Sequence, residues 1–292
     1  MDKGDKGHGI VDIAIRQLTE ADIIEADQVL RAAFKTPESR AGDLRRCLAL
    51  QPDGFLVAIC GDVLAGTVGA VDYGPFAYVG LMAVQPEFQG RGLGHALMQR
   101  IVNWLDTRNV PMSLLDATIF GAPIYTQFGF VDQDQACLFQ LCGNTPRPFS
   151  SEQVYPLQSG DIESLRNFDM PIYGADRARL FQLLHADFPG RAFVTRDAAG
   201  RVSGYLFAQT RRIGPWAAER PQGAQTLLQA ALSLTYEGAP AVIAPGMNGA
   251  AKQMLEQVGF QFVRTARHMR RGGSHLINQR DLIYGQTSFG LG

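Results

Sequence analysis

The sequence lacks the features that would place it among membrane, secreted or disulfide-rich proteins. No apolar run in its 292 residues approaches the roughly 20 residues that a transmembrane helix needs. The N-terminal segment also lacks the apolar core of a signal peptide. The chain has only four cysteines, and none forms a Cys-x-x-Cys pair, which argues against a disulfide framework. We therefore expect a cytoplasmic protein with free thiols and no membrane contact.

The sequence also gives no indication of a metal site or of nucleic-acid binding. The five histidines show no metal-ligand spacing, so we expect no metal. The formal net charge is only −1, whereas nucleic-acid-binding domains are strongly basic, so we expect no nucleic acid partner. The charge is nevertheless uneven: residues 1–150 carry 12 Lys+Arg and 17 Asp+Glu, and residues 151–292 carry 15 and 11. This asymmetry indicates either opposite ligand preferences or the complementary surfaces of an interface.

The length of the chain indicates two globular domains, at about 150 residues each. A hydrophobic fraction of 46% is sufficient for a packed core. Residues 144–151 read NTPRPFSS, and two prolines among small polar residues are typical of a linker. We therefore predict a first domain over 1–143, a linker over 144–151 and a second domain over 152–292.

The two halves contain an internal repeat. QFGFV at 127–131 matches QVGFQ at 257–261, and ALMQRIVNWL at 96–105 aligns with TLLQAALSLT at 226–235, both at an offset of 130. Earlier matches, such as LTEADI at 18–23 with LQSGDI at 157–162, keep the same order. Matches in a constant order predict two copies of one fold.

Helices alternate with strands in the predicted secondary structure of the first half. Hydrophobic periodicity predicts helices over 20–34, 39–50, 92–108 and 123–128, and strands over 54–60, 78–84, 112–118 and 130–141. The early strands have the spacing of hairpins. We therefore predict an α+β fold in which each copy is a mixed, mostly antiparallel sheet flanked by helices.

A glycine-rich loop between strand 78–84 and helix 92–108 is the clearest candidate ligand site. It reads QGRGLGH over residues 89–95. Glycines permit positive φ and close approach of a ligand, and a helix N-terminus favours anions such as a diphosphate. Taken alone, the spacing suits a tight turn without a ligand as well. The loop has neither the Lys-Ser/Thr of a P-loop nor the spacing of the dinucleotide fingerprint.

Together with a second motif, this loop resembles the acyl-CoA pyrophosphate loop of the GCN5-related N-acetyltransferases. Q-x-x-G-x-G occupies residues 89–94, and Y-x-x-x-G-F occupies residues 125–130, as in that family. The resemblance covers residues 11–141. Residues 152–270 look like a degenerate second copy, so the whole chain resembles the tandem two-domain members of the family.

The resemblance implies acetyl transfer from acetyl-CoA, the co-substrate, to a primary amine. It implies that the backbone of strand 82–84 pairs with the pantetheine arm, as an added strand would, and that loop N–H groups hold the diphosphate. The side chains of Arg91 or His95 could add positive charge near the diphosphate. The cofactor-contacting residues implied in this way are Met82, Ala83, Val84, Gln89, Gly90, Arg91, Gly92, Leu93, Gly94 and His95.

The resemblance also gives Tyr125 the role of the acid that protonates the departing CoA thiolate. The alternative for this residue is an aromatic side chain packed in the core. For the general base, position alone suggests Asp116, with Asp72, Tyr73, Glu87 or a chain of waters as alternatives. Asp116 equally suits a strand-end carboxylate that makes local hydrogen bonds. The acceptor, a small-molecule or peptide amine, stays open, although the acidic first half favours a cationic one. A CoA-binding sensor without turnover is the alternative function.

The second copy lacks the parts that carry this chemistry. Residues 84–96 of the first copy are thirteen, whereas the corresponding residues 218–226 are nine and keep only Gly223 of the loop glycines. Leu255 stands in the place of Tyr125. We therefore predict a non-catalytic second domain that shapes the acceptor pocket or forms a homodimer.

Two features of the second half remain. RTARHMRR at 264–271 is a basic run, which is either a solvated strand face or a site for an anionic substrate group or the 3′-phosphate of CoA. The segment TSFGLG at 287–292 has no charge, which favours docking against the fold over a frayed end.

Overall fold

The computed structural model describes residues 13–143, 147–273 and 278–292, which divide into two compact units. The first unit comprises the described residues up to 69 together with 81–104, and the second comprises 70–80 and the described residues from 105 onward. Part of the predicted linker, residues 144–146, lies outside the described residues, and the domain boundary there stays a prediction.

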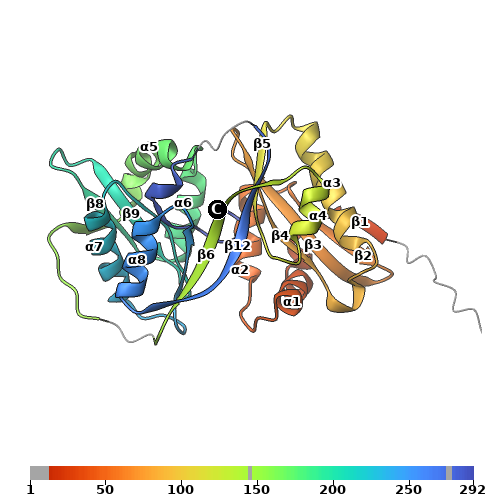
Figure 1. Cartoon of the computed structure of the whole chain (residues 1–292), viewed down its shortest axis with the longest axis horizontal. Coiled ribbons are helices and arrows are strands. Elements are labelled where there is room, and N and C mark those ends of the chain that lie inside the picture. The colour runs from red at the N-terminus through yellow and green to blue at the C-terminus, as the bar shows by residue number, and fades with distance from the viewer. Residues whose placement is uncertain (1–12, 144–146, 274–277) are drawn as a thin grey trace, which may run out of the picture. The chain divides into compact units, whose positions relative to one another are not determined.

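In the first unit, an antiparallel ladder β1–β2–β3 carries two amphipathic helices and the start of a third (Figure 1). Strand β1 pairs with β2, which pairs with β3, and the apolar sides of the helices are buried. Strands β3 and β4 each contribute residues to both units. The elements are β1 (Ile13–Gln17), α1 (Ile23–Phe34), α2 (Ala41–Leu50), β2 (Phe55–Cys60), β3 (Val63–Asp72), β4 (Ala77–Val84) and α3 (Leu93–Thr107).

The second unit contains a mixed sheet in which the two copies of the repeat exchange strands. Strand β5 (Met112–Ala117) runs parallel to β4, and α4 (Ala122–Gln127) leads into β6 (Val131–Leu141). Strand β12 (Phe260–Gly272), from the second copy, lies between β5 and β6, and β6 pairs on its other side with β11 (Ala241–Pro245). Figure 1 shows β6 and β12 side by side. Strand β12 therefore lies between two strands of the first copy, and β6 lies between two strands of the second.

The rest of the second copy forms a five-stranded antiparallel sheet in the order β13-β10-β9-β8-β7, with four helices. The strands are β7 (Val154–Pro156), β8 (Ala192–Arg196), β9 (Val202–Ala208), β10 (Ile213–Ala218) and β13 (Ile283–Gly285). The helices are α5 (Ile162–Tyr173), α6 (Ala178–Asp187), α7 (Pro221–Leu232) and α8 (Gly249–Gln257), and a 3₁₀ turn spans Arg280–Leu282.

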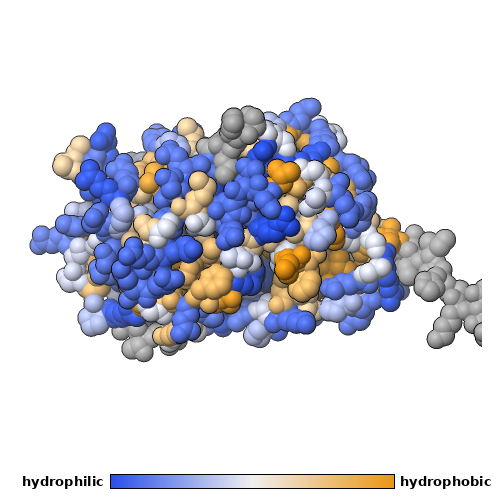
Figure 2. Space-filling model, viewed as in Figure 1, coloured by the Kyte–Doolittle hydropathy of each residue, from blue (hydrophilic) through white to orange (hydrophobic). Residues whose placement is uncertain are grey.

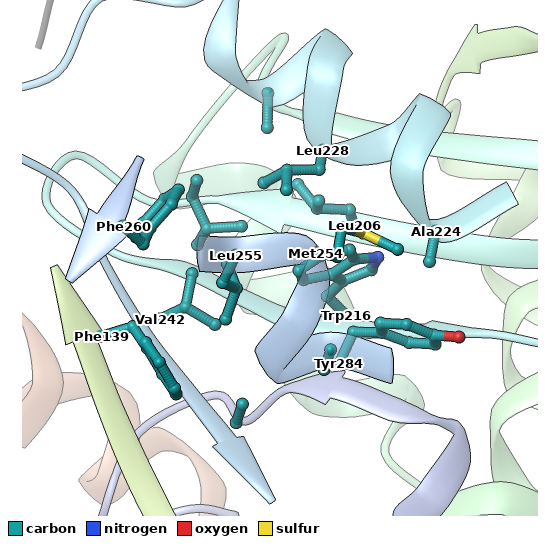
Figure 3. Close-up of a cluster of buried hydrophobic side chains, with 14 of the residues drawn as sticks. Phe139, Leu206, Trp216, Ala224, Leu228, Val242, Met254, Leu255, Phe260 and Tyr284 are labelled. Carbon is teal, nitrogen blue, oxygen red and sulfur yellow. The ribbon is translucent and has the colours of Figure 1, made fainter. Parts of the chain in front are cut away.

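The core of the second copy includes side chains of the exchanged strand. Trp216, Leu228 and Leu255 pack in one buried cluster, and Phe139 of β6 belongs to that cluster although it comes from the first half of the chain (Figure 3). A strand that fills another copy's core is fixed by burial as well as by its backbone ladder. The exchange therefore places side chains of β6 in the hydrophobic core of the second copy.

The structure confirms the α+β fold with mixed sheets flanked by helices. The predicted helices and strands of the first half are present, with bounds that differ by at most three residues. In the part of the chain that the structure describes, each helix is too short or too polar to cross a bilayer. Figure 2 shows hydrophilic residues over most of the visible face, with hydrophobic residues in scattered positions.

Candidate active site

The glycine-rich loop joins β4 to the N-terminus of α3, and its backbone takes the conformation that glycine allows. Leu81 within β4 has a φ of +52°, and the loop then passes through a 3₁₀ turn at Pro86–Phe88. Gly90 and Gly92 have φ values of +73° and +84°, and α3 begins directly afterwards. The first-turn N–H groups of a helix have no partner within the helix, so this end of α3 can receive an anion.

The loop is anchored at its base and open at its tip. Gln85 donates its backbone N–H to Ala65 O at 2.8 Å, and the Gln89 side chain donates to Val84 O at 2.9 Å. Nothing lies within 4 Å of where a Cβ on Gly90 or Gly92 would sit, and the Arg91 side chain is exposed. The tip of the loop is therefore open to a ligand that approaches its backbone. Among the other loop residues implied in cofactor binding, Leu93 is buried and His95 is exposed.

Tyr125 lies on α4, which begins with Pro123 in its first turn. The ring packs against Phe130 with centroids 6.2 Å apart, and the residue is 8% exposed. A Cβ on Gly121 would come within 3.3 Å of the Tyr125 hydroxyl oxygen, so a glycine there leaves room for the phenol. Burial raises the pKa of Tyr125, which keeps the phenol protonated and able to donate.

Asp116, on β5, is a fully buried carboxylate that accepts three hydrogen bonds. Tyr78 Oη donates to Oδ2 at 2.7 Å, Gln286 Nε2 donates to the same oxygen at 2.7 Å, and His268 Nδ1 lies 2.8 Å from Oδ1. Burial opposes ionisation, but the His268 contact and the nearby Arg280 outweigh it and lower the pKa of Asp116. A carboxylate stabilised in this way is a weak base.

The hydrogen-bond network continues beyond Asp116. His268 Nε2 lies 3.3 Å from a nitrogen of Arg280, and Arg280 Nε donates to Asp134 at 2.7 Å. Burial, with the Arg280 charge, lowers the pKa of His268 despite the nearby Asp116. Sequence reasoning missed Tyr78 and Gln286 as members of this site. Their only signal was position: one begins the strand that leads to the glycine loop, and the other precedes the uncharged segment 287–292.

The other general-base candidates occupy different environments. Asp72 accepts a hydrogen bond from the Gly74 N–H and lies 3.5 Å from Arg108. Tyr73 packs edge-on against Tyr173, and Glu87 is exposed in the 3₁₀ turn of the loop. The hydroxyl that reaches the Asp116 carboxylate in the second unit is that of Tyr78. The role of each stays a prediction.

In the second copy, the loop is replaced by a direct passage from strand to helix. Strand β10 ends at Ala218, and α7 begins at Pro221. Glu219 N donates to Ser203 O at 3.0 Å, matching the anchor at Gln85 in the first copy. Leu255 is fully buried on α8. The second copy thus keeps the framework of the site and has neither the loop nor a phenol at that position.

In the second copy, β13 lies between β10 and β11 at the point where these two strands diverge. Strands β10 and β11 begin as parallel neighbours at the bridge Arg212↔Ala241, as β4 and β5 do over 77–79. Beyond the bridge, β13 pairs antiparallel with β10, and Gln286 N donates to Ile243 O of β11 at 2.8 Å. Strand β13 pairs with Trp216 and Ala217 of β10, which correspond to Met82 and Ala83 of β4.

The basic run of the second half forms ion pairs with acidic residues of the first half. Arg267 donates to Asp132 at 2.7 Å, and Arg271 donates to Asp106 at 2.7 Å. Arg264 lies over the Phe289 ring at 4.6 Å. The charge asymmetry had two explanations, opposite ligand preferences or complementary surfaces. These ion pairs agree with complementary surfaces on the two halves. The segment 287–292 is docked, as expected, with Leu291 only 2% exposed.

This fold is that of the GNAT class of domains. The family model described as acetyltransferase (GNAT) domain matches residues 14–131, and a second model of that description matches residues 165–285. The chain belongs to the GNAT acetyltransferase family and contains two such domains in tandem.

Named relatives agree with this assignment. The chain is 39% identical over 87 residues to the acetyltransferase plu1384 of Photorhabdus laumondii, which covers 27% of this chain and 59% of that protein. It is 25% identical over 156 residues to the uncharacterised N-acetyltransferase YitH of Bacillus subtilis, covering 52% of this chain and 53% of that one. The chain thus spans little more than half of either relative.

A solved structure shares the whole fold. A protein of Pyrococcus horikoshii assigned as an acetyltransferase aligns over 100% of both chains with a TM-score of 0.85 and 24% identity. At that identity the likeness concerns the arrangement of strands and helices. The tandem architecture is therefore shared with at least one other protein of known structure.

Proposed function

We propose that this protein is an acetyl-CoA-dependent N-acetyltransferase that acts on a primary amine through its first copy. The observation that carries the proposal is the open loop with Gly90 and Gly92 at positive φ, directly before α3. Acetyl-CoA supplies an activated acetyl thioester and a diphosphate. The loop N–H groups, the N-terminus of α3 and Arg91 suit the diphosphate, and the exposed loop leaves it access.

Tyr125 serves as the acid in this proposal. When the amine displaces the thiolate, the C–S bond breaks and the sulfur needs a proton. Tyr125 Oη donates that proton, and the phenolate left behind takes one up again from solvent. Burial raises the pKa of Tyr125, so the phenol is neutral and carries its proton in the resting protein. The amine loses a proton to solvent or to a water chain, since Asp116 already accepts three hydrogen bonds. Asp116 then contributes negative charge and orientation at the site.

The second copy is non-catalytic in this proposal. Strand β13 pairs with the edge of β10 that an added pantetheine strand would need, and two residues between β10 and α7 cannot wrap a diphosphate. The first copy therefore holds the single acetyl-CoA site. The protein works in the cytoplasm on a small-molecule or peptide amine, without a metal or nucleic acid.

Replacing Tyr125 with Phe tests the proposed acid. The ring and its packing on Phe130 remain, so acetyl-CoA binding should be unchanged, while kcat falls by about 100-fold because the thiolate loses its proton donor. Release of the CoA thiol is measured across a panel of polyamines, aminoglycosides, amino acids and peptide N-termini. Tyr155→Phe, at an exposed tyrosine, is the matched control.

The outcomes of this assay separate two functions. Turnover by the wild type together with a slow Tyr125→Phe variant supports the proposal. Tight binding of acetyl-CoA without turnover of any amine in the panel would instead favour a CoA-binding sensor.

A further inference from the structure

The buried carboxylate of the first copy is held by side chains that the second copy supplies. Asp116 belongs to β5, whereas His268 lies on β12 and Gln286 follows β13. Strand exchange places His268 directly opposite Asp116 in the β5–β12 ladder and directly opposite Asp134 in the β12–β6 ladder. A histidine thus sits between two carboxylates, one from each neighbouring strand.

The partners of His268 specify one tautomer. Arg280 carries only donors, so the Nε2 atom that it faces at 3.3 Å has to be the unprotonated, accepting nitrogen. The proton then resides on Nδ1, which donates to Asp116 at 2.8 Å. Protonating both nitrogens would place a cation against the Arg280 guanidinium in a fully buried position. The imidazole is therefore a neutral donor with a fixed orientation.

Gln286 links the carboxylate to Tyr78. Its Nε2 lies 2.7 Å from Asp116 Oδ2 and 3.2 Å from Tyr78 Oη. The buried Oε1 of Gln286 has no hydrogen-bond partner among the described residues, so it is an unsatisfied acceptor in this network. Gln286 is 2% exposed, and Tyr78 is 1% exposed. Neither side chain can change its orientation without breaking the contact with Asp116.

We propose that His268 and Gln286 are positioning residues through which the second copy completes the acetyl-transfer site of the first. His268 fixes Asp116 Oδ1, and Gln286 fixes Oδ2 together with the Tyr78 hydroxyl. This inference rests on the proposed function, because it needs an acetyl-transfer site at Asp116. It gives a role to the polar, fully buried histidine on β12 of a copy that has neither the loop nor the phenol.

Kinetics of two substitutions at one position test the proposal. His268→Phe keeps a ring but removes the donor, and we expect kcat to fall at least tenfold with an unchanged Kd for acetyl-CoA. His268→Asn returns an amide N–H near the place of Nδ1, and kcat should recover to within threefold of wild type. The amine is the panel member that the wild type acetylates fastest. Arg267→Gln, one residue earlier in an exposed ion pair with Asp132, is the control and should stay within twofold.

A spectroscopic measurement tests the same geometry without turnover. In protein labelled with ¹⁵N-histidine, the signals lost in His268→Asn should show a neutral Nδ1–H tautomer from pH 8 to pH 5. The charged groups that face His268 are Asp116, Asp134 and Arg280, with Tyr78 nearby, and burial with Arg280 keeps its pKa below the ordinary value. Protonation near pH 6.5, or the Nε2–H tautomer, would overturn the proposal.

The two arms also separate this proposal from the proposed function. Equal kcat in wild type and His268→Phe, both folded and turning over, would overturn the positioning role while leaving the acetyltransferase intact. A wild type that neither binds acetyl-CoA nor transfers acetyl groups would remove the proposed function. The tautomer then still decides whether His268 holds Asp116.

Discussion

Replacing Gly92 with Val should abolish acetyl-CoA binding, with Kd weakened at least 100-fold. The backbone at Gly92 has a φ of +84°, which a β-branched residue adopts only with strain. No atom lies within 4 Å of where its Cβ would sit, so the new side chain would project into the open space above the loop. That space is where the diphosphate has to lie in the proposed function. Isothermal titration calorimetry with acetyl-CoA measures the loss.

The matched control is Gly223→Ala in the second copy. Gly223 lies within α7, and a Cβ there would meet only the Thr195 hydroxyl oxygen at 3.6 Å, an ordinary contact. Alanine inside a helix should stabilise the fold by about 0.5–1 kcal/mol and leave Kd unchanged. Wild type should bind one acetyl-CoA per chain. Two equivalent sites, or half of the sites surviving in Gly92→Val, would contradict a single site in the first copy.

The loop could be predicted from the sequence because its determinants are local. Glycines at alternate positions, an apolar strand before them and an amphipathic helix after them appear in one continuous segment. The structure places positive φ at Gly90 and Gly92 and begins α3 at the next residue. The internal repeat could also be detected from the sequence. An insertion or deletion changes the number of residues between matching segments but leaves the order of those segments the same. Cofactor contacts of these residues stay a prediction.

The partners of the strands could not be predicted in the same way. The sequence predicts a strand over 130–141 and indicates a strand face at 264–271, but such patterns say nothing about which strand lies beside which. Two copies of one fold make the ambiguity worse, since each final strand fits either copy. The contacts of Asp116 with His268 and Gln286 depend on that choice. Position alone left Asp116 either as a base or as a hydrogen-bonded carboxylate, and the structure gives it three hydrogen-bond contacts, two of them from the second copy.

The basic run shows the same limit in its charges. Arg267 and Arg271 were candidates for a solvated face or an anion site, and both pair with aspartates of the first half. The opposite net charges of the halves, −5 and +4, were already compatible with complementary charged surfaces. Choosing it required knowing that β12 lies between β5 and β6.

Neither half of the chain should fold alone, because strand exchange leaves each with an incomplete sheet. In residues 1–143, β5 and β6 would lose β12 from between them, and β6 would also lose β11. In residues 147–292, the core around Trp216 and Leu255 would lose Phe139. Exposed strand edges and apolar cores favour aggregation. We therefore expect each half, expressed separately, to be insoluble or to melt without a cooperative transition.

Coexpression should rescue both halves. With different tags on 1–143 and 147–292, we expect one-to-one copurification, a single cooperative thermal transition and acetyl-CoA binding like that of the intact chain. The control is an intact chain with a protease site inserted between Ser150 and Ser151, where the backbone is neither helix nor strand. Cleaved after folding, its halves should stay together, because the ladders of β12 with β5 and β6 do not depend on the link at that point. A soluble, cooperatively folding 1–143 that binds acetyl-CoA by itself would show that the first copy completes its sheet without β12, and the exchange would then be dispensable for the site.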